Sequence, residues 1–165
     1  MASRVPKEIM SREVELGVVS FKPKDKFVKS VSVSTDELLL IVPQNHSLAN
    51  KKIVSIKDLE TENFIAHNAP SPYRKQVIDK FENYKTPLNI SIEMPSLEAI
   101  KKLVEMGAGV ALVPKLTAQN EITSGILKGL SVKEMRLKRR LHIVYRRNGV
   151  LTHAAKRFLK LVKEM

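Results

Sequence analysis

The spacing of hydrophobic residues between positions 92 and 114 predicts a strand, a helix and a second strand in direct succession. Ser96 is a suitable helix N-cap, because its hydroxyl can accept a hydrogen bond from a free backbone N–H of the first turn. The apolar stripe of this helix, from which Lys101, Lys102 and Glu105 are excluded, consists of Leu97, Ile100, Leu103 and Val104. Gly107 stands where a left-handed C-cap is expected, and Gly109 opens an unbroken apolar run that ends at Pro114.

A strand, a crossover helix and a second strand form a βαβ unit, which places the chain in the α/β class. The helix that starts at Ser96 then begins beyond the carboxyl end of the preceding strand. Its first backbone N–H groups and the positive end of its dipole point outward there. Ligands of open α/β sheets bind at this edge, so the same segment predicts a candidate ligand site.

The pattern predicts further elements along the rest of the chain. Strands are expected at residues 15–21, 28–33, 37–42, 63–67, 87–93 and 140–146. Helices are expected at residues 5–11, 55–59, 72–84, 116–122 and 152–162. Residues 126–130 are expected to form a turn-rich passage.

Charge and length restrict the classes of function. The 165 residues suffice for one domain or two small lobes, and the hydrophobic content of 43% is that of a globular protein. Lys and Arg number 29 against 17 Asp and Glu, a formal net charge of +12. This excess favours nucleic acid, an anionic surface or an anionic small molecule as a partner, or else a solvated basic surface.

Several features are absent from the sequence. Without cysteine, disulfides, thiol catalysis and cysteine-based zinc sites are excluded. No apolar run is long enough for a transmembrane helix, and the first residues lack the apolar segment of a secretory signal. We therefore expect a cytoplasmic protein without membrane contact.

The sequence predicts neither catalysis nor a cofactor. No two of the histidines at positions 46, 67, 142 and 153 have a zinc-type spacing, and no pair of acidic residues is fixed for acid–base chemistry. Gly107 and Gly109 follow a helix, whereas a phosphate-binding loop precedes one. We expect a protein that is not an enzyme and that has no metal site.

One ordered set of residues consists of Glu93, Ser96, Glu98, Ala99, Ile100, Leu103, Val104, Gly107 and Gly109 to Pro114. This set resembles the signature of the effector-binding domain of LysR-type transcriptional regulators. Weaker matches in the right order are the strand before Pro43 with the His46 turn after it, the Ser55 to Leu59 segment, and the basic strand and helix at the end. The resemblance covers nearly all of residues 5–165.

The resemblance implies a type 2 periplasmic-binding-protein-like fold, in which two Rossmann-like lobes are joined by crossing strands. Residues 31–137 would form the second lobe, and residues 1–30 and 138–165 an incomplete first lobe. The family's helix-turn-helix, its linker helix and the first strand–helix–strand of its effector domain have no counterpart in this sequence. DNA contact is therefore expected only through a domain absent from this chain, and self-association as a dimer or larger assembly is expected.

The resemblance also implies where a small-molecule effector binds. In the family the ligand lies between the lobes, against turns that follow strands. The corresponding residues here are Val19, Ser20, Asn68, Ala69, Pro70, Ser71, Pro95 and Ser96. Two helix N-termini with serine caps suit a carboxylate or another small anion, and Arg74 could hold it bidentately. The alternative is that the serines only cap their helices and that Arg74 is only exposed.

The function implied is ligand sensing: a small, anionic metabolite binds between the lobes and changes how the regulator assembles on DNA. Three alternatives stay open. They are a solute-binding protein of the same fold, a nucleic-acid-binding module that uses the charge of +12 directly, and an enzyme on this fold.

Overall fold

The computed structural model describes residues 4–164, which divide into two compact units. The first unit contains the residues up to Asp36 and those from Lys138 onward, and the second contains Glu37–Leu137. Strand β2 (Val28–Pro43) passes from the first unit into the second. The sequence placed the change of lobe at residue 30, within this strand.

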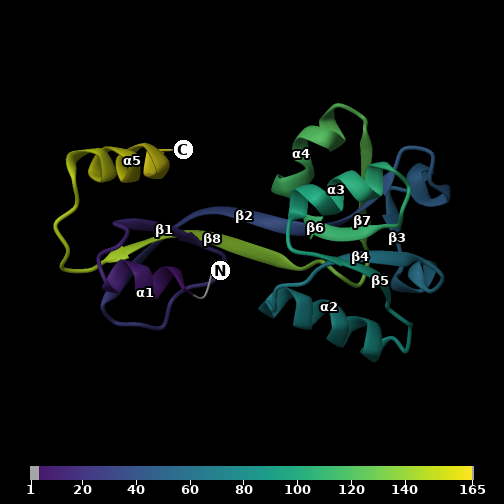
Figure 1. Cartoon of the computed structure of the whole chain (residues 1–165), viewed down its shortest axis with the longest axis horizontal. Helices are drawn as coiled ribbons and strands as arrows, with labels where there is room; N and C mark the ends of the chain where they lie inside the picture. Colours follow the sequence, from purple (N-terminus) through teal and green to yellow (C-terminus); the bar gives the residue numbers. More distant parts are fainter. Residues whose placement is uncertain (1–3, 165) are drawn as a thin grey trace. The chain divides into compact units, whose positions relative to one another are not determined.

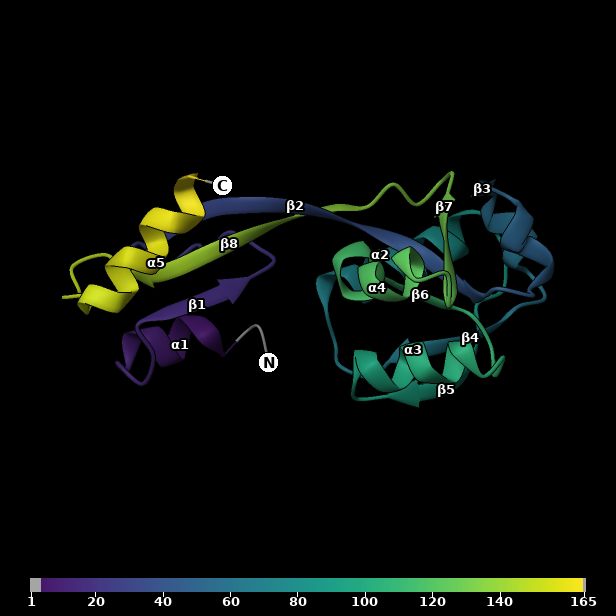
Figure 2. The ribbon, with the colours of Figure 1, turned by 90° about the horizontal axis from the view of Figure 1, so that it is seen from above.

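Three strands and two helices make up the first unit (Figures 1 and 2). They are α1 (Val5–Met10), β1 (Leu16–Val19), the first part of β2, β8 (Lys138–Arg146) and α5 (His153–Glu164). Strand β8 lies between β1 and β2, and it is antiparallel to β1. In Figure 1, α1 and α5 lie on opposite sides of these strands. Gly17 of β1 leaves the room that the Val5 side chain of α1 fills.

The last helix is anchored to the start of β1 through Thr152. Its backbone N–H and hydroxyl donate to the two carboxylate oxygens of Glu15, at 2.9 and 2.7 Å. The same hydroxyl accepts from the backbone N–H of Ala155 at 3.3 Å, which confirms Thr152 as the cap of α5. The hydrogen bonds from Thr152 lower the pKa of Glu15 below its usual value.

The second unit is built on strands that join through one central segment. Besides the end of β2, its strands are β3 (Ile53–Val54), β4 (Asn63–His67), β5 (Asn89–Met94), β6 (Ala111–Pro114) and β7 (Leu127–Val132). Strands β6 and β7 are both antiparallel to β2, β3 is parallel to β7, and β5 is parallel to β4. Val110 bridges to Phe64 of β4, so residues 110–114 connect the β4–β5 pair to β2.

Helices cover both faces of these strands (Figure 1). They are α2 (Pro72–Asn83), α3 (Leu97–Glu105) and α4 (Lys115–Thr123), with two short 3₁₀ helices, η1 (Ser47–Asn50) and η2 (Ile56–Leu59). Leu40 packs in a core with Phe81 of α2, whereas its neighbour Ile41 packs in another core with Ile100 of α3 and Ala118 of α4. Alternate residues of β2 thus enter different cores, which explains why its apolar run is unbroken.

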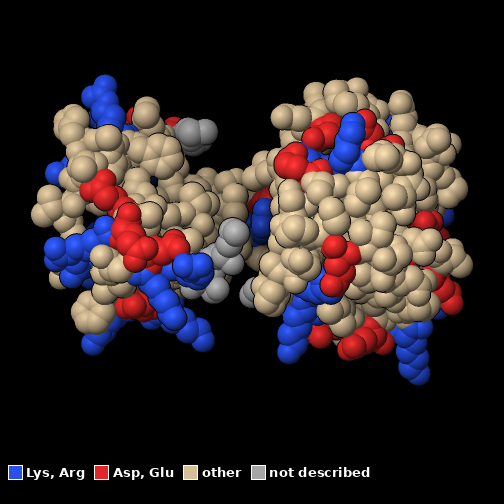
Figure 3. Space-filling model, viewed as in Figure 1, with Lys and Arg blue, Asp and Glu red and all other residues tan. Residues whose placement is uncertain are grey.

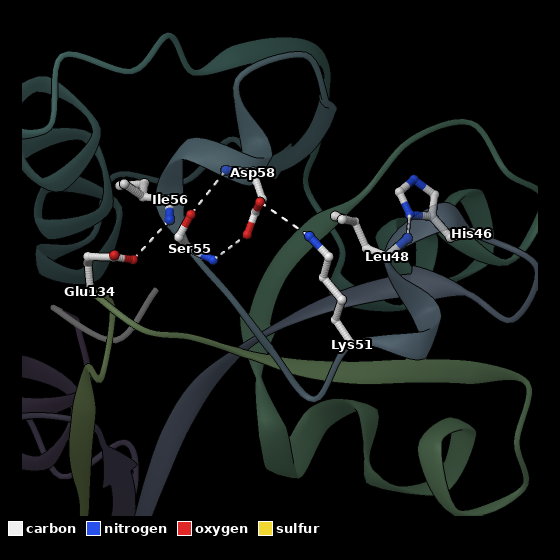
Figure 4. Close-up of polar contacts among 7 residues, drawn as sticks. All are labelled: His46, Leu48, Lys51, Ser55, Ile56, Asp58 and Glu134. Atoms are coloured by element: carbon white, nitrogen blue, oxygen red, sulfur yellow. Dashed lines mark hydrogen bonds and ion pairs between the residues drawn. The ribbon is translucent and has the colours of Figure 1, made fainter.

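Polar contacts confirm the short helix expected at residues 55–59 and show that the turn after His46 is a second short helix (Figure 4). The Ser55 hydroxyl accepts from the Asp58 N–H, and the Asp58 carboxylate accepts from the Ser55 N–H, which is a capping box. The Ser55 N–H lowers the pKa of Asp58. Glu134 accepts from the Ile56 N–H at 2.9 Å, and His46 Nδ1 accepts from the Leu48 N–H.

Gly107 and Gly109 have different roles after α3. Gly107 has a φ of 79°, and its N–H and that of Ala108 donate to Val104 and Leu103, which confirms the left-handed C-cap. At Gly109 a Cβ atom would lie only 2.5 Å from the carbonyl oxygen of Asn63. Glycine therefore allows Val110 to pair closely with β4.

The structure corrects three of the predicted elements. Residues 28–33 and 37–42 are parts of one continuous strand, β2. Residues 126–130, expected as turns, contribute most of strand β7, because β2 supplies hydrogen-bond partners to Leu127–Leu130. The segment after α3, expected as a parallel strand, pairs in parallel only at Val110, with Phe64 of β4. The strand β6 that follows is antiparallel to β2.

The fourth correction concerns Lys101, which the apolar stripe of α3 left on the outside. Its side chain is only 8% exposed. The ammonium group donates to the Thr117 carbonyl oxygen at 2.9 Å and to Glu121 Oε1 at 2.7 Å, both on α4. Lys101 is therefore an internal link between two helices.

Candidate functional site

The carboxyl ends of β4 and β5 meet at one edge of the second unit. These strands are parallel, and His67 pairs with Met94, so the turns that follow begin side by side. The Asn68 N–H donates to the Met94 carbonyl oxygen at 3.0 Å and joins the two turns directly. Helices α2 and α3 begin immediately beyond them. This edge is the position expected for a ligand in an α/β sheet.

Seven of the nine predicted site residues belong to this edge. They are Asn68, Ala69, Pro70, Ser71, Arg74, Pro95 and Ser96, each of which is exposed or partly exposed. The contact between Asn68 and Met94 brings the two groups of residues together within one rigid turn pair. That they bind a ligand stays a prediction.

The two serines at this edge differ. The Ser71 hydroxyl accepts from the Arg74 N–H at 3.1 Å, as expected of an N-cap. Ser96 occupies the N-cap position of α3 as predicted, but its side chain does not form the expected capping hydrogen bond. The hydroxyl of Ser96 and the first N–H groups of α3 are therefore available at the edge for an acceptor outside the helix.

Arg74 is held between the two strands. Its Nη1 donates to the His67 carbonyl oxygen at 2.6 Å, and its Nη2 pairs with Glu93 Oε1. His67 in turn accepts the Ala69 N–H at its Nδ1. The roles of His67 and Glu93 were missed, because they depend on the pairing of strands that are 22 residues or more apart in sequence. The sequence showed Glu93 only as part of the family motif.

The other two predicted residues, Val19 and Ser20, end β1 in the first unit. The Val19 side chain is only 1% exposed and packs with Ile9, Val28 and Val144, so only its backbone could face a ligand. Ser20 is partly exposed.

A basic group surrounds this end of β1, and the sequence did not identify it. His142 of β8 pairs with Val19 and is buried, and its Nδ1 has no hydrogen-bond partner among the described residues. Its pKa is lowered by burial, then by the positive charges of Arg140 and Lys22. These effects favour the neutral form of His142, so the positive charge at this end of β1 comes from Lys22 and Arg140. The pairing of β1 with β8 brings His142 to the end of β1, and the charges of Lys22 and Arg140 act on it there.

No metal site accompanies these groups: nowhere in residues 4–164 do three or more His, Cys, Asp or Glu side chains gather so as to hold an ion. No helix in the same part of the chain is both long and apolar enough to span a membrane.

Comparison with known proteins establishes the class. The sequence model of the LysR substrate binding domain family matches residues 1–165, and the chain belongs to that family. It is 31% identical over 167 residues to a probable RuBisCO transcriptional regulator of Phaeodactylum tricornutum, and 30% identical over 169 residues to one of Cyanophora paradoxa. These alignments cover 98% of the chain and 54% and 52% of the relatives, so the chain spans about half of their length.

Solved structures confirm the fold. The Synechocystis PCC6803 CcmR regulatory domain in complex with 2-PG superposes with a TM-score of 0.82 at 24% identity, covering 98% of this chain and 77% of that one. The effector binding domain of QuiR in complex with shikimate gives 0.78 at 20% identity, covering 98% and 76%. The chain therefore has the type 2 periplasmic-binding-protein-like fold of LysR effector-binding domains, as the resemblance implied.

Proposed function

We propose that this chain senses a small anionic metabolite on behalf of a LysR-type transcriptional regulator whose DNA-binding domain lies outside these 165 residues. The observation that carries the proposal is the edge of the second unit, where the uncapped Ser96 and the N-terminus of α3 are available beside the Asn68–Ser71 turn. Backbone N–H groups at such a terminus suit an anion. Lys22 and Arg140 at the end of β1 supply positive charge in the first unit.

The basic residues near the predicted ligand residues differ in whether their charge is already paired. Arg74 is already paired with Glu93, so its charge is largely compensated within the second unit. Arg140 is exposed and shares a strand face with the buried His142, two residues away. Within the first unit we therefore assign recognition of negative charge to Lys22 and Arg140. Within the second unit we assign hydrogen bonding to an anion to the turn that contains Ser96.

Titration calorimetry tests this assignment. We expect the chain to bind at least one of three anions: 2-PG, shikimate or inorganic phosphate. A hydrogen bond to a charged group contributes about 1.5–3 kcal/mol. Arg140→Gln should therefore lower the affinity for the anion about tenfold or more. Ser96→Ala should weaken it severalfold, since a neutral hydrogen bond contributes about 1 kcal/mol.

The control is Lys7→Gln, which removes an exposed charge from α1 in the same unit and should leave the affinity within about twofold. A panel in which no anion binds, or in which the Arg140 and Ser96 variants bind like the unchanged chain, would refute the proposed site.

The proposal includes self-association. In the first unit, Val18 and Phe27 are 58% and 52% exposed, and Phe158 and Leu161 of α5 are 48% and 57% exposed. Phe158 and Leu161 are three residues apart and therefore adjacent on the helix surface, where an exposed apolar pair can contribute to a protein contact. Sedimentation velocity should show a dimer or larger species whose fraction rises with concentration, and Phe158→Ser with Leu161→Ser should shift it toward monomer. A monomer at every concentration would contradict this part.

A further inference from the structure

The charge of this chain is concentrated in one of its two units. Residues 1–36 and 138–165 contain 16 Lys and Arg against 6 Asp and Glu, a formal charge of +10. Residues 37–137 contain 13 against 11, a charge of +2. In Figure 3, Lys and Arg side chains project at several separate points from the visible face of the first unit. The acidic residues of the first unit are too few to neutralise its lysines and arginines.

Helix α5 carries an ordered part of this charge. Lys156, Lys160 and Lys163 follow one another at spacings of four and three, so they form one row on the helix, and all three are exposed. Ala155 and Leu159, on another side of the helix, are buried. The row of lysines therefore faces solvent.

A second basic group lies where β2 begins and β8 ends. The Arg147 N–H donates to the Phe27 carbonyl oxygen at 2.8 Å, which places Arg147 beside the segment that contains Lys26 and Lys29. All three side chains are exposed. The first unit thus carries exposed basic groups both on α5 and at the ends of two strands.

We propose that the first unit binds the phosphate backbone of double-stranded DNA, without reading sequence, through these exposed lysines and arginines. The relatives are transcriptional regulators, and a regulator bound near its promoter would keep this surface close to DNA. Lys and Arg on phosphates supply sequence-independent affinity and strong dependence on salt. This contact would be additional to any made by a separate DNA-binding domain, and it does not depend on effector binding.

Duplex DNA fits the surface better than a membrane does. A membrane-surface helix inserts its whole apolar face between lipids, but α5 already buries Ala155 and Leu159 of that face within the protein. The second basic group lies at the start of β2 and just after β8, and it is therefore not part of a helix that could insert into lipid. A rigid array of phosphates can contact both groups.

Fluorescence anisotropy with a mixed-sequence DNA duplex, repeated at several salt concentrations, tests the proposal on this 165-residue chain. Each phosphate contact contributes about 0.9 to the slope of log K against log salt. The variant K156Q/K160Q/K163Q should therefore lower the steepness by about 2 to 3 and weaken binding about tenfold or more at low salt.

The matched control is K52Q/K57Q/K75Q, which removes the same charge from exposed lysines of the second unit. It should change the slope by less than about 1. Equal losses in both variants would show that net charge alone is responsible and would overturn the proposal. It would also be overturned if the unchanged chain failed to bind DNA at low salt, or bound only phosphatidylglycerol vesicles.

Discussion

Lys101→Met is expected to destabilise the second unit by about 3–5 kcal/mol, because it leaves a carboxylate without its counter-charge between two helices. Glu121 loses its 2.7 Å partner, and its second oxygen, Oε2, is already buried without a hydrogen-bond partner among the described residues. Glu98, the other carboxylate near Lys101, is 75% exposed and gains little from the contact. Urea unfolding followed by circular dichroism measures the change.

Two further variants separate the pair from general effects on α3. Lys102→Met alters the next residue, whose side chain is 67% exposed and pairs with Glu105, so it should change stability by no more than about 0.5 kcal/mol. In the double variant K101M/E121L both charges are gone, and most of the lost stability should return. A single variant as stable as the unchanged chain would show that the pair is unimportant.

The contribution of this pair should depend on pH at both extremes. Burial acts to lower the pKa of Lys101, but its hydrogen bonds to Glu121 and Glu98 outweigh burial, and its pKa is raised above 10.5. The hydrogen bond from Lys101 lowers the pKa of Glu121 below 4.5. The stability from Glu121 is therefore lost as pH falls below about 4.5, and that from Lys101 as pH rises above about 10.5. Between these limits the effect of Lys101→Met should be nearly constant.

The sequence predicted the elements well where the deciding signals are local. Features that depend only on residues close in sequence were predicted correctly. They are the cap of α2, the short helix η2, the left-handed turn at Gly107 and the bounds of β4. The resemblance to LysR effector domains was confirmed for the same reason, since it rests on an ordered series of local motifs. The order of strands and helices along the chain was enough to predict that α2 and α3 begin at the edge where a ligand is expected.

The errors arose where a distant segment decides the outcome. Residues 126–130 look like turns because of Gly125 and Gly129, and only the presence of β2 makes them a strand. Lys101 is buried because α4 supplies a carbonyl and a carboxylate, 16 and 20 residues later in the sequence. The basic group around His142 likewise depends on the antiparallel pairing of β1 with β8, more than 120 residues apart. Hydrophobic periodicity does not contain this information.

The second large effect is expected from Arg139→Met, at about 3–5 kcal/mol, because Asp36 is among the most deeply buried charged groups of the chain. The Asp36 side chain is 1% exposed, and its Oδ2 accepts from both Nε and Nη2 of Arg139, at 3.1 and 2.7 Å. Without the guanidinium, the buried carboxylate loses these two charge-assisted hydrogen bonds. Arg139→Lys should lose less stability, since it keeps the charge but not the two-pronged geometry.

This pair has a particular place in the chain. Asp36 is the last residue of the first unit on β2, and Arg139 is the second residue after the chain returns on β8. Immediately beyond, the Leu38 N–H donates to the Leu137 carbonyl oxygen at 3.2 Å. The ion pair and this hydrogen bond join the two strands at the points where they pass between the units. Loss of Arg139 should therefore loosen the segments around residues 36–38 and 137–139. Amide hydrogen exchange should then accelerate at Leu38 before it does in α3.

The comparison for Arg139 is Lys138→Met, which changes the exposed neighbour on the same strand and should leave both stability and exchange close to those of the unchanged chain. The double variant D36V/R139M should regain most of the stability, because valine suits a buried strand position and no charge remains there. If exchange at Leu38 stays accelerated in the double variant, the two charges are needed to hold β2 and β8 together at this point. Normal exchange in Arg139→Met would instead show that the pair does not hold the two strands together.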